Sequence, residues 1–169
     1  MDITELILFQ HHEQRRMFAL LDDFDPGDSE TLGAVWSRLA ILLEVHARAE
    51  EKFFYPRLLT VGKGAGGEDS AASETKDAIK DHNEIRDGIT EAGKHAVGSD
   101  QWWKGVIDAR TANSDHMAEE EREDLPDFRR HADLQTRHDI AVQFIAYEAK
   151  YADGIAAENK NPQRYVDEH

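Results

Sequence analysis

The sequence predicts an all-α fold, an up-down bundle of four helices with an additional helix at the C-terminus. Long segments carry apolar residues at the three- and four-residue spacing of amphipathic helices. Glycine, proline and small polar residues separate them, and these connections are short enough for neighbouring helices to run antiparallel. A third observation is a motif of His, paired Glu and Pro that occurs in both the second and the fourth helix, at an offset of 70 residues.

The five helices are expected at about residues 3–24, 29–59, 73–97, 99–126 and 133–155. Pro26-Gly27 ends the first helix, and Asp28 or Ser29 can cap the second. Pro56 is expected to kink or end the second helix, because proline lacks an N–H and clashes with the preceding turn.

Two regions follow from this division of the chain. Residues 1–130 are expected to form the four-helix bundle, and residues 131–169 a C-terminal helix and polar tail packed on it. The fifth helix either covers the bundle or makes a homodimer contact. Residues 61–70, which contain four glycines, are expected to form a flexible loop, and the polar end at 159–169 is expected to fray.

Composition restricts the class of protein. The 169 residues carry a formal net charge of −15, which argues against nucleic acid and anionic membranes as partners. Because the chain has no cysteine, any metal must be held by His and carboxylate, which suits iron, manganese or zinc. There is no apolar run of membrane length and no signal-peptide pattern, so we expect a cytoplasmic protein.

The repeated motif places a His four residues before a Glu on the same face of a helix. Its two copies pair His46 with His116, Glu50 with Glu120, Glu51 with Glu121 and Pro56 with Pro126. Two such helices that face each other would present four ligands to one point, as metal sites in helical bundles require. The alternative is a pair of solvated His/Glu contacts, but composition predicts only about one such pair by chance.

The first and third helices share a second pattern, His-x-Glu-x-Arg, which begins at His11 and at His82. His12 is the alternative in the first helix, since the offset of 70 residues selects it. The apolar stripe and the match with His82 favour His11, because adjacent helical residues differ by ~100° around the axis. At ~1.5 Å rise per residue, all four helices bring a His to about the same layer of the bundle.

The order of these motifs resembles the hemerythrin-like family, also called the His-His-Glu cation-binding domain, over about residues 1–128. The resemblance implies an up-down four-helix bundle around a non-haem di-iron centre with an oxo or hydroxo bridge. Carried over by position, it implies six ligands, His11, His46, Glu50, His82, His116 and Glu120. Glu50 and Glu120 would be the carboxylates that bridge the irons.

The sequence departs from the oxygen carriers of that family. Those proteins have five His and place a second His one turn along the third helix, where this chain has Ala78 and Arg86. It also has Glu rather than Asp after the last His. One iron should therefore have a more open shell, which favours reaction with peroxide or NO over reversible carriage of O₂.

These features favour a di-iron protein that binds or reacts with O₂, H₂O₂ or NO, with catalase- or peroxidase-like activity as the expected chemistry. The alternatives are an iron or oxygen sensor without turnover and a structural bundle without metal. Glu51 and Glu121 could orient ligand histidines, although solvated positions are favoured. Tyr55 could reach the site as a ligating or redox-active phenol, although a packing role is favoured.

Overall fold

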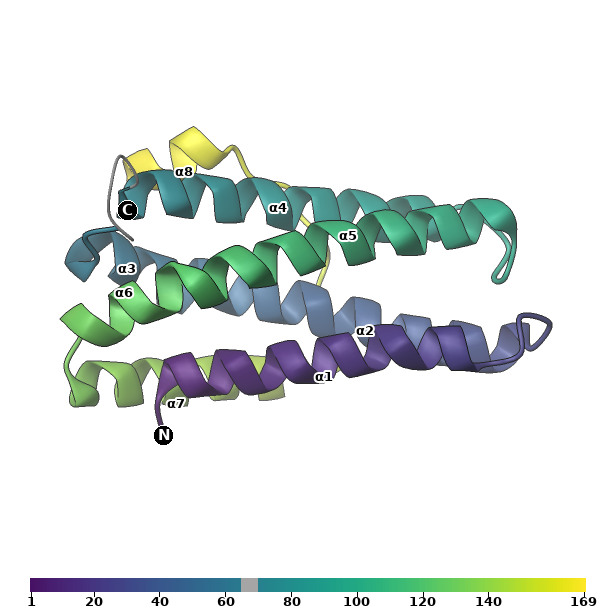
Figure 1. Ribbon diagram of the computed structural model, residues 1–169, viewed down its shortest axis with the longest axis horizontal. Helices are drawn as coiled ribbons and strands as arrows, with labels where there is room; N and C mark the ends of the chain where they lie inside the picture. The colour runs from purple at the N-terminus through teal and green to yellow at the C-terminus, as the bar shows by residue number, and fades with distance from the viewer. Residues whose placement is uncertain (65–69) are drawn as a thin grey trace.

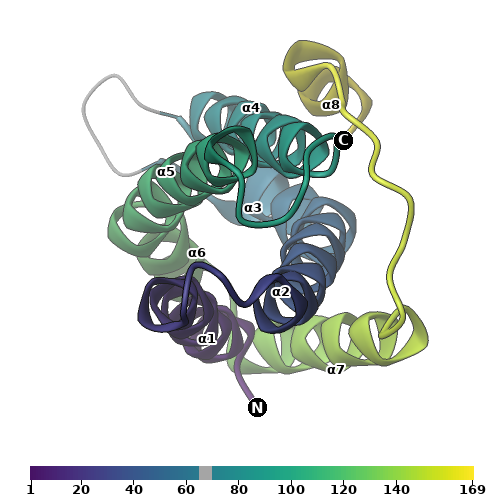
Figure 2. The same ribbon diagram turned by 90° about the vertical axis from the view of Figure 1, so that its right-hand side faces the viewer.

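The computed structural model describes residues 1–64 and 70–169, and within that part it is a helical bundle without strands (Figure 1). Its four long helices are α1 (Ile3–Asp23), α2 (Ser29–Ala49), α4 (Ala71–Ala92) and α5 (Asp100–Arg122). They alternate in direction along the length of the molecule and form a ring in the end-on view of Figure 2. The expected all-α, up-down bundle is therefore confirmed.

The long helices begin at side-chain caps. Asp2, Asp28, Ser70 and Ser99 each accept a hydrogen bond from a backbone N–H in the first turn of α1, α2, α4 and α5. Each cap satisfies one of the N–H groups that a helix start leaves unpaired, and is worth ~1 kcal/mol. Asp28, rather than Ser29, therefore sets the start of the second helix.

Of the two effects expected of Pro56, a kink or an end of the second helix, the structure does not show an end. The helical run continues as a π-helix, η1 (Glu50–Phe54), and then as α3 (Tyr55–Val61). In the π register the absent N–H of Pro56 would have paired with the carbonyl of Glu51. That carbonyl instead accepts a hydrogen bond from the hydroxyl of Tyr165, so its hydrogen bond is replaced rather than lost.

Other boundaries differ from the expected ones. The third helix begins two residues early, after Ser70, and ends at Ala92 rather than near residue 97. The fourth ends at Arg122, before Pro126, and after Glu123 a separate helix, α6 (Asp124–His131), begins. Pro126 lies in the first turn of α6, where no intrahelical N–H is needed. The fifth, α7 (Leu134–Lys150), is shorter than expected. In the expected loop at 61–70, residues 65–69 lie outside the described part.

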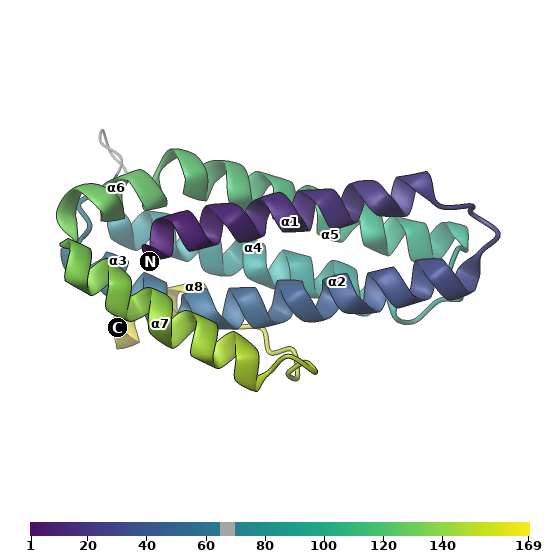
Figure 3. The same ribbon diagram turned by 90° about the horizontal axis from the view of Figure 1, so that it is seen from below.

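The C-terminal segment packs on the bundle. Figures 2 and 3 show α7 alongside α1 and α2, and α8 (Pro162–Glu168) against α4. The expectation of a frayed tail is wrong, since α8 has an Asn161 cap and buries Tyr165. Within the described residues, no helix combines the length and the apolar character that crossing a membrane requires.

The apolar core is divided into two clusters. One contains Ile7, Phe54, Leu58, Phe128 and Phe144 near the end where α3 and α6 lie. The other contains Phe18, Trp36, Leu39, Trp102 and Val106 toward the opposite end. His11 lies between Ile7 and Phe18 along α1, so a buried polar layer separates the two clusters.

Helices α4 and α5 make a close contact through small residues. A Cβ atom added to Gly88 would lie 2.6 Å from the backbone nitrogen of Ala109, and one added to Gly105 would lie 2.5 Å from that of Ala92. These two glycines therefore let the backbones approach closely. The contact brings His82 of α4 and His116 of α5 together, with their Nε2 atoms 3.2 Å apart.

Candidate metal centre

The polar layer gathers side chains from all four long helices and from η1. It contains the six residues predicted from the sequence, His11, His46, Glu50, His82, His116 and Glu120. None of them is more than 3% exposed. Burial of so many titratable groups in one layer is costly unless they are paired or bind a metal.

Two groups of ligand-type atoms share one carboxylate. His11, His46 and Glu50 bring one donor atom each to within 4.8 Å of one another, and Glu50, His82 and His116 do the same. One oxygen of Glu50 lies 2.8 Å from Nε2 of His46, and the other lies 3.2 Å from Nε2 of His82. Glu50 therefore faces both groups, one with each oxygen.

Glu120 also spans the two groups. Its Oε2 lies 3.3 Å from Nε2 of His11 and 3.9 Å from Nε2 of His116. Its Oε1 accepts a hydrogen bond of 3.1 Å from the hydroxyl of Tyr55, which is fully buried. The Tyr55 contact fixes the carboxylate so that Oε2 points to the histidines, a polar role beyond the packing role that the sequence favoured.

The outer nitrogens of the histidines are held by hydrogen-bond acceptors. Nδ1 of His11 donates to Glu121 at 2.9 Å, and Nδ1 of His82 donates to Glu51 at 3.1 Å. A carboxylate can only accept here, so the proton of each neutral imidazole sits on Nδ1 and the lone pair on Nε2 points into the layer. Such contacts are the usual outer support of metal-binding histidines.

The amide of Gln10 supports His46 in the same way. Its Nε2 donates to Glu148 of α7 at 2.8 Å, which leaves Oε1 to accept from Nδ1 of His46 at 2.6 Å. The carboxylate of Glu148 therefore sets the orientation of the amide and, through it, the tautomer of His46. Nδ1 of His116 has a longer contact, 4.0 Å to Asp81.

The favoured interpretation of Glu51 and Glu121 as solvated residues is wrong. Glu51 is 1% exposed and contacts Arg86 at 2.8 Å and Lys160 at 2.7 Å as well as His82. Glu121 joins His11 to Arg15. Their matching places in the repeated motif were the signal, since each directly follows a Glu of the polar layer. Sequence reasoning missed Gln10 and Lys160, because neither residue belongs to a recognisable motif.

The electrostatics of the metal-free layer favour ion pairs. Burial lowers the pKa of His11, but Glu120 and Glu121 outweigh burial and raise that pKa to about 9. Burial likewise lowers the pKa of His82, and Glu50 and Glu51 raise it to about 9. Burial raises the pKa of Glu50, but His46, His116 and His82 hold it well below its usual range.

The nitrogen and oxygen atoms that point into the layer are better placed to bind a cation than to form hydrogen bonds with one another. Nε2 of His11 and His46, both oxygens of Glu50 and Oε2 of Glu120 are buried without a partner in hydrogen-bond geometry among the described residues. These atoms nevertheless face one another at ion-pair distance. Imidazole nitrogens and carboxylate oxygens are suitable ligands for iron, manganese and zinc. The layer therefore has the chemistry of a cation site.

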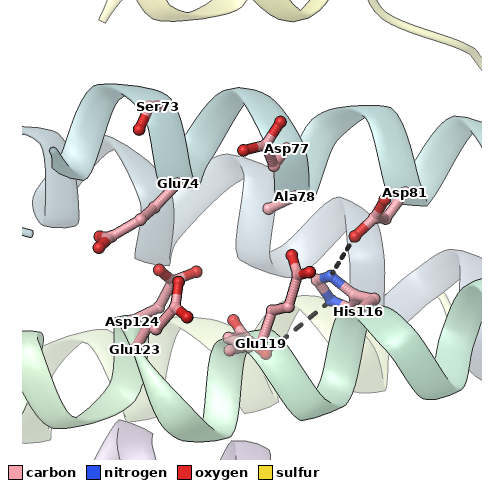
Figure 4. Close-up of a pocket in the computed structure, with 10 residues that line it drawn as sticks. Ser73, Glu74, Asp77, Ala78, Asp81, His116, Glu119, Glu123 and Asp124 are labelled. Atoms are coloured by element: carbon pink, nitrogen blue, oxygen red, sulfur yellow. Dashed lines mark ion pairs between the residues drawn. The ribbon is translucent and has the colours of Figure 1, made fainter. Parts of the chain in front are cut away.

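Three positions that were considered as ligand positions in the sequence, His12, Ala78 and Arg86, contribute no ligand to the layer. His12 is exposed, so His11 is the member of the adjacent pair that points inward. Arg86 is buried and paired with Glu44 and Glu51. Ala78 offers no donor atom and borders a small acidic pocket beside His116, which Figure 4 shows.

The fold and the polar layer define a helical-bundle protein with a buried His/carboxylate cation site. Comparison with family models gives one match, the hemerythrin HHE cation-binding domain, over residues 2–128. Since this match covers well over half of the chain, the protein belongs to the hemerythrin family and is a metal-binding protein. No curated protein and no solved structure gave a significant match.

Proposed function

We propose that the polar layer holds two iron ions and that the protein binds or reacts with a small oxidant, H₂O₂, O₂ or NO. The proposed ligands are His11, His46, Glu50, His82, His116 and Glu120. The observation that carries the proposal is the shared carboxylate of Glu50, because its two oxygens face two separate groups of histidines. A single ion would leave one group without a partner.

Iron, once bound, would supply redox cycling and coordination positions for a small molecule. The protein's own residues provide orientation and exclusion of water. Glu51, Glu121 and Gln10 hold the outer nitrogens of three histidines, and the two apolar clusters close the layer from both ends. Tyr55 keeps its proton on the hydroxyl, because burial and then Glu120 raise its pKa well above the usual value.

The donor set favours reactivity over reversible carriage of oxygen. Ala78 and Arg86 occupy the third-helix positions where the oxygen carriers of this family have a further His. Alanine has no donor atom, and the guanidinium of Arg86 donates to Glu44, Glu51 and Asn83. The more open shell that results supports catalase- or peroxidase-like decomposition of peroxide as the leading activity.

The test is peroxide turnover by iron-loaded protein, with the absorption spectrum recorded before and after addition of H₂O₂, O₂ or NO. We expect turnover above that of free iron and a change in the charge-transfer bands. A suitable control is protein loaded with zinc, which has no redox chemistry. An unchanged spectrum with all three molecules, together with turnover no faster than free iron, would refute the proposal.

A second candidate is an iron or oxygen sensor, which the contacts of the C-terminal segment favour. Lys160 and Tyr165 both contact Glu51, the acceptor for His82, although both lie beyond the region that matches the family. Metal binding could therefore alter the position of this segment. The sensor predicts that removal of iron changes stability, assembly state and amide exchange in residues 157–169. Identical values with and without iron would exclude it.

A further inference from the structure

An acidic pocket opens beside the centre, between α4 and the end of α5. Its lining contains seven carboxylates, Glu74, Asp77, Asp81, Glu119, Glu120, Glu123 and Asp124. Ser73, Ala78 and His116 complete the described lining, which includes no lysine or arginine. Figure 4 shows the carboxylates of the two helices facing each other across the pocket. Such a concentration of negative charge attracts cations.

The pocket leads from the surface to the proposed ligands. Asp77 and Glu119 are exposed at its rim, and neither makes an ion pair with another described residue. Asp81 and Glu123 are half-buried, and Glu123 is paired with Arg122. His116 and Glu120 form the floor, 3% and 1% exposed. The same two side chains therefore belong to both the pocket and the centre.

Asp124 is the feature that sets this pocket apart from an ordinary acidic surface. Its carboxylate is 4% exposed, lines the pocket and has neither a hydrogen bond nor an ion pair to any other described residue. A buried carboxylate without a partner is costly, and its neighbours Glu120 and Glu123 are acidic too. A cation in the pocket would supply the missing partner.

The size of the pocket is also suitable. Its volume is about 30 Å³. A water molecule needs ~10–15 Å³ on this measure, so the space has room for a partly dehydrated metal ion but not for an organic ligand. Ala78 is the one apolar residue of the described lining, and its short side chain helps to leave this space open.

From this geometry we propose that the acidic pocket is the entrance through which a divalent metal ion reaches the centre. Asp77 and Glu119 attract the hydrated ion, Asp124 takes it as it loses water, and Glu120 with His116 receives it. No bond between non-metal atoms is made or broken in this passage. The inference rests on the proposed centre, because it assigns Glu120 and His116 as the first ligands reached.

The experiment measures the rate of iron uptake by the metal-free protein. Ferrous iron is mixed with protein anaerobically, uptake is stopped at set times with an excess of a ferrous chelator, and iron per chain is determined. The rim variant is Asp77→Asn with Glu119→Gln. The matched control is Asp23→Asn with Asp153→Asn, which removes the same charge from exposed sites away from the pocket. Asp124→Asn is tested separately, with circular dichroism to verify its fold.

We expect the rim variant to take up iron at least about threefold more slowly at low ionic strength, with the same final iron content. This difference should vanish near 1 M salt, where the screening length falls to about 3 Å. The control should behave as the parent does. Asp124→Asn should slow uptake at every ionic strength, because it acts by direct contact rather than by long-range attraction.

Other outcomes overturn the inference in different ways. Equal uptake rates in the parent, the rim variant and Asp124→Asn would show that the ion enters elsewhere. A lower final iron content at an unchanged rate would mean that the pocket is a resident site and not an entrance. If none of the proteins retains iron, the proposed centre itself fails, and the entrance fails with it.

Discussion

At the scale of single residues, the contacts of the outer imidazole nitrogen distinguish the histidines of the centre. Nδ1 of His11, His46 and His82 each meets an acceptor, so the inner Nε2 of each faces the layer, where it can bind a metal. His12 is exposed, although it is adjacent in sequence. The sequence favoured His11 over His12 as the ligand on the first helix, and in the structure His11 is the one of the two that points into the layer.

Substitution of these two neighbours tests the assignment. His11→Ala should lower the affinity for metal by more than the ~10–100-fold that loss of an outer hydrogen-bond partner costs, because it removes a ligand. His12→Ala should leave affinity unchanged. Titration of metal-free protein with ferrous iron measures both. Equal losses in the two variants, or a loss only in His12→Ala, would contradict the choice of His11.

Proton release provides a second residue-scale prediction. His11 and His82 have pKa values raised to about 9, so at pH 7 in the metal-free protein both imidazoles are in the charged form, with a proton on each ring nitrogen. Binding at Nε2 requires the neutral form, so metal uptake at pH 7 should release about two protons from these residues. Apparent affinity should therefore rise with pH up to about 9. Calorimetry in buffers of different ionisation enthalpy measures the release, and no release at pH 7 would contradict it.

At the scale of elements, the π-helix η1 was not predictable from the apolar pattern. The sequence showed Pro56 and hence a break in the backbone hydrogen bonds of the second helix. It did not show that Tyr165, 114 residues from Glu51, would satisfy the carbonyl that is freed. Tertiary contact therefore decided whether the helix ended, and η1 keeps Glu50 and Glu51 in the polar layer.

Tyr165→Phe removes this hydrogen bond while leaving the ring in place. The Glu51 carbonyl would then be buried and unpaired, so the free energy of unfolding should fall by ~1–3 kcal/mol. Tyr151→Phe is the control, because no hydrogen bond joins the Tyr151 hydroxyl to another described residue. It should change stability by less than ~0.5 kcal/mol. Chemical denaturation measures both, and equal effects would mean that the Tyr165 contact contributes nothing.

The contact between α4 and α5 makes another element-scale prediction. In Gly88→Ala the new Cβ would meet the backbone of Ala109, so we expect a loss of ~1–3 kcal/mol and weaker metal binding as His82 and His116 separate. In Gly33→Ala the new Cβ would be 3.5 Å from Val97, an ordinary contact. That variant should gain up to ~1 kcal/mol from helix propensity. Thermal unfolding of both proteins is the measurement, and equal shifts would refute close packing at Gly88.

At the scale of the whole molecule, the bundle is organised around its polar layer. The sequence predicted that four helices bring a His to one level, because the distance of each His from the turns could be counted. It also predicted which Glu residues join them. It could not predict the supporting contacts from α7 and from the segment before α8, since Glu148 and Lys160 belong to no recognisable pattern. They act across more than a hundred residues, 138 from Gln10 and 109 from Glu51.

We propose that the layer binds two iron ions, because Glu50 and Glu120 each face both groups of histidines. The most direct measurement is iron per chain after anaerobic loading and desalting, compared between the parent and Glu50→Gln. We expect two irons per chain in the parent and fewer than two in the variant. One iron or none in the parent, or two in both proteins, would contradict it.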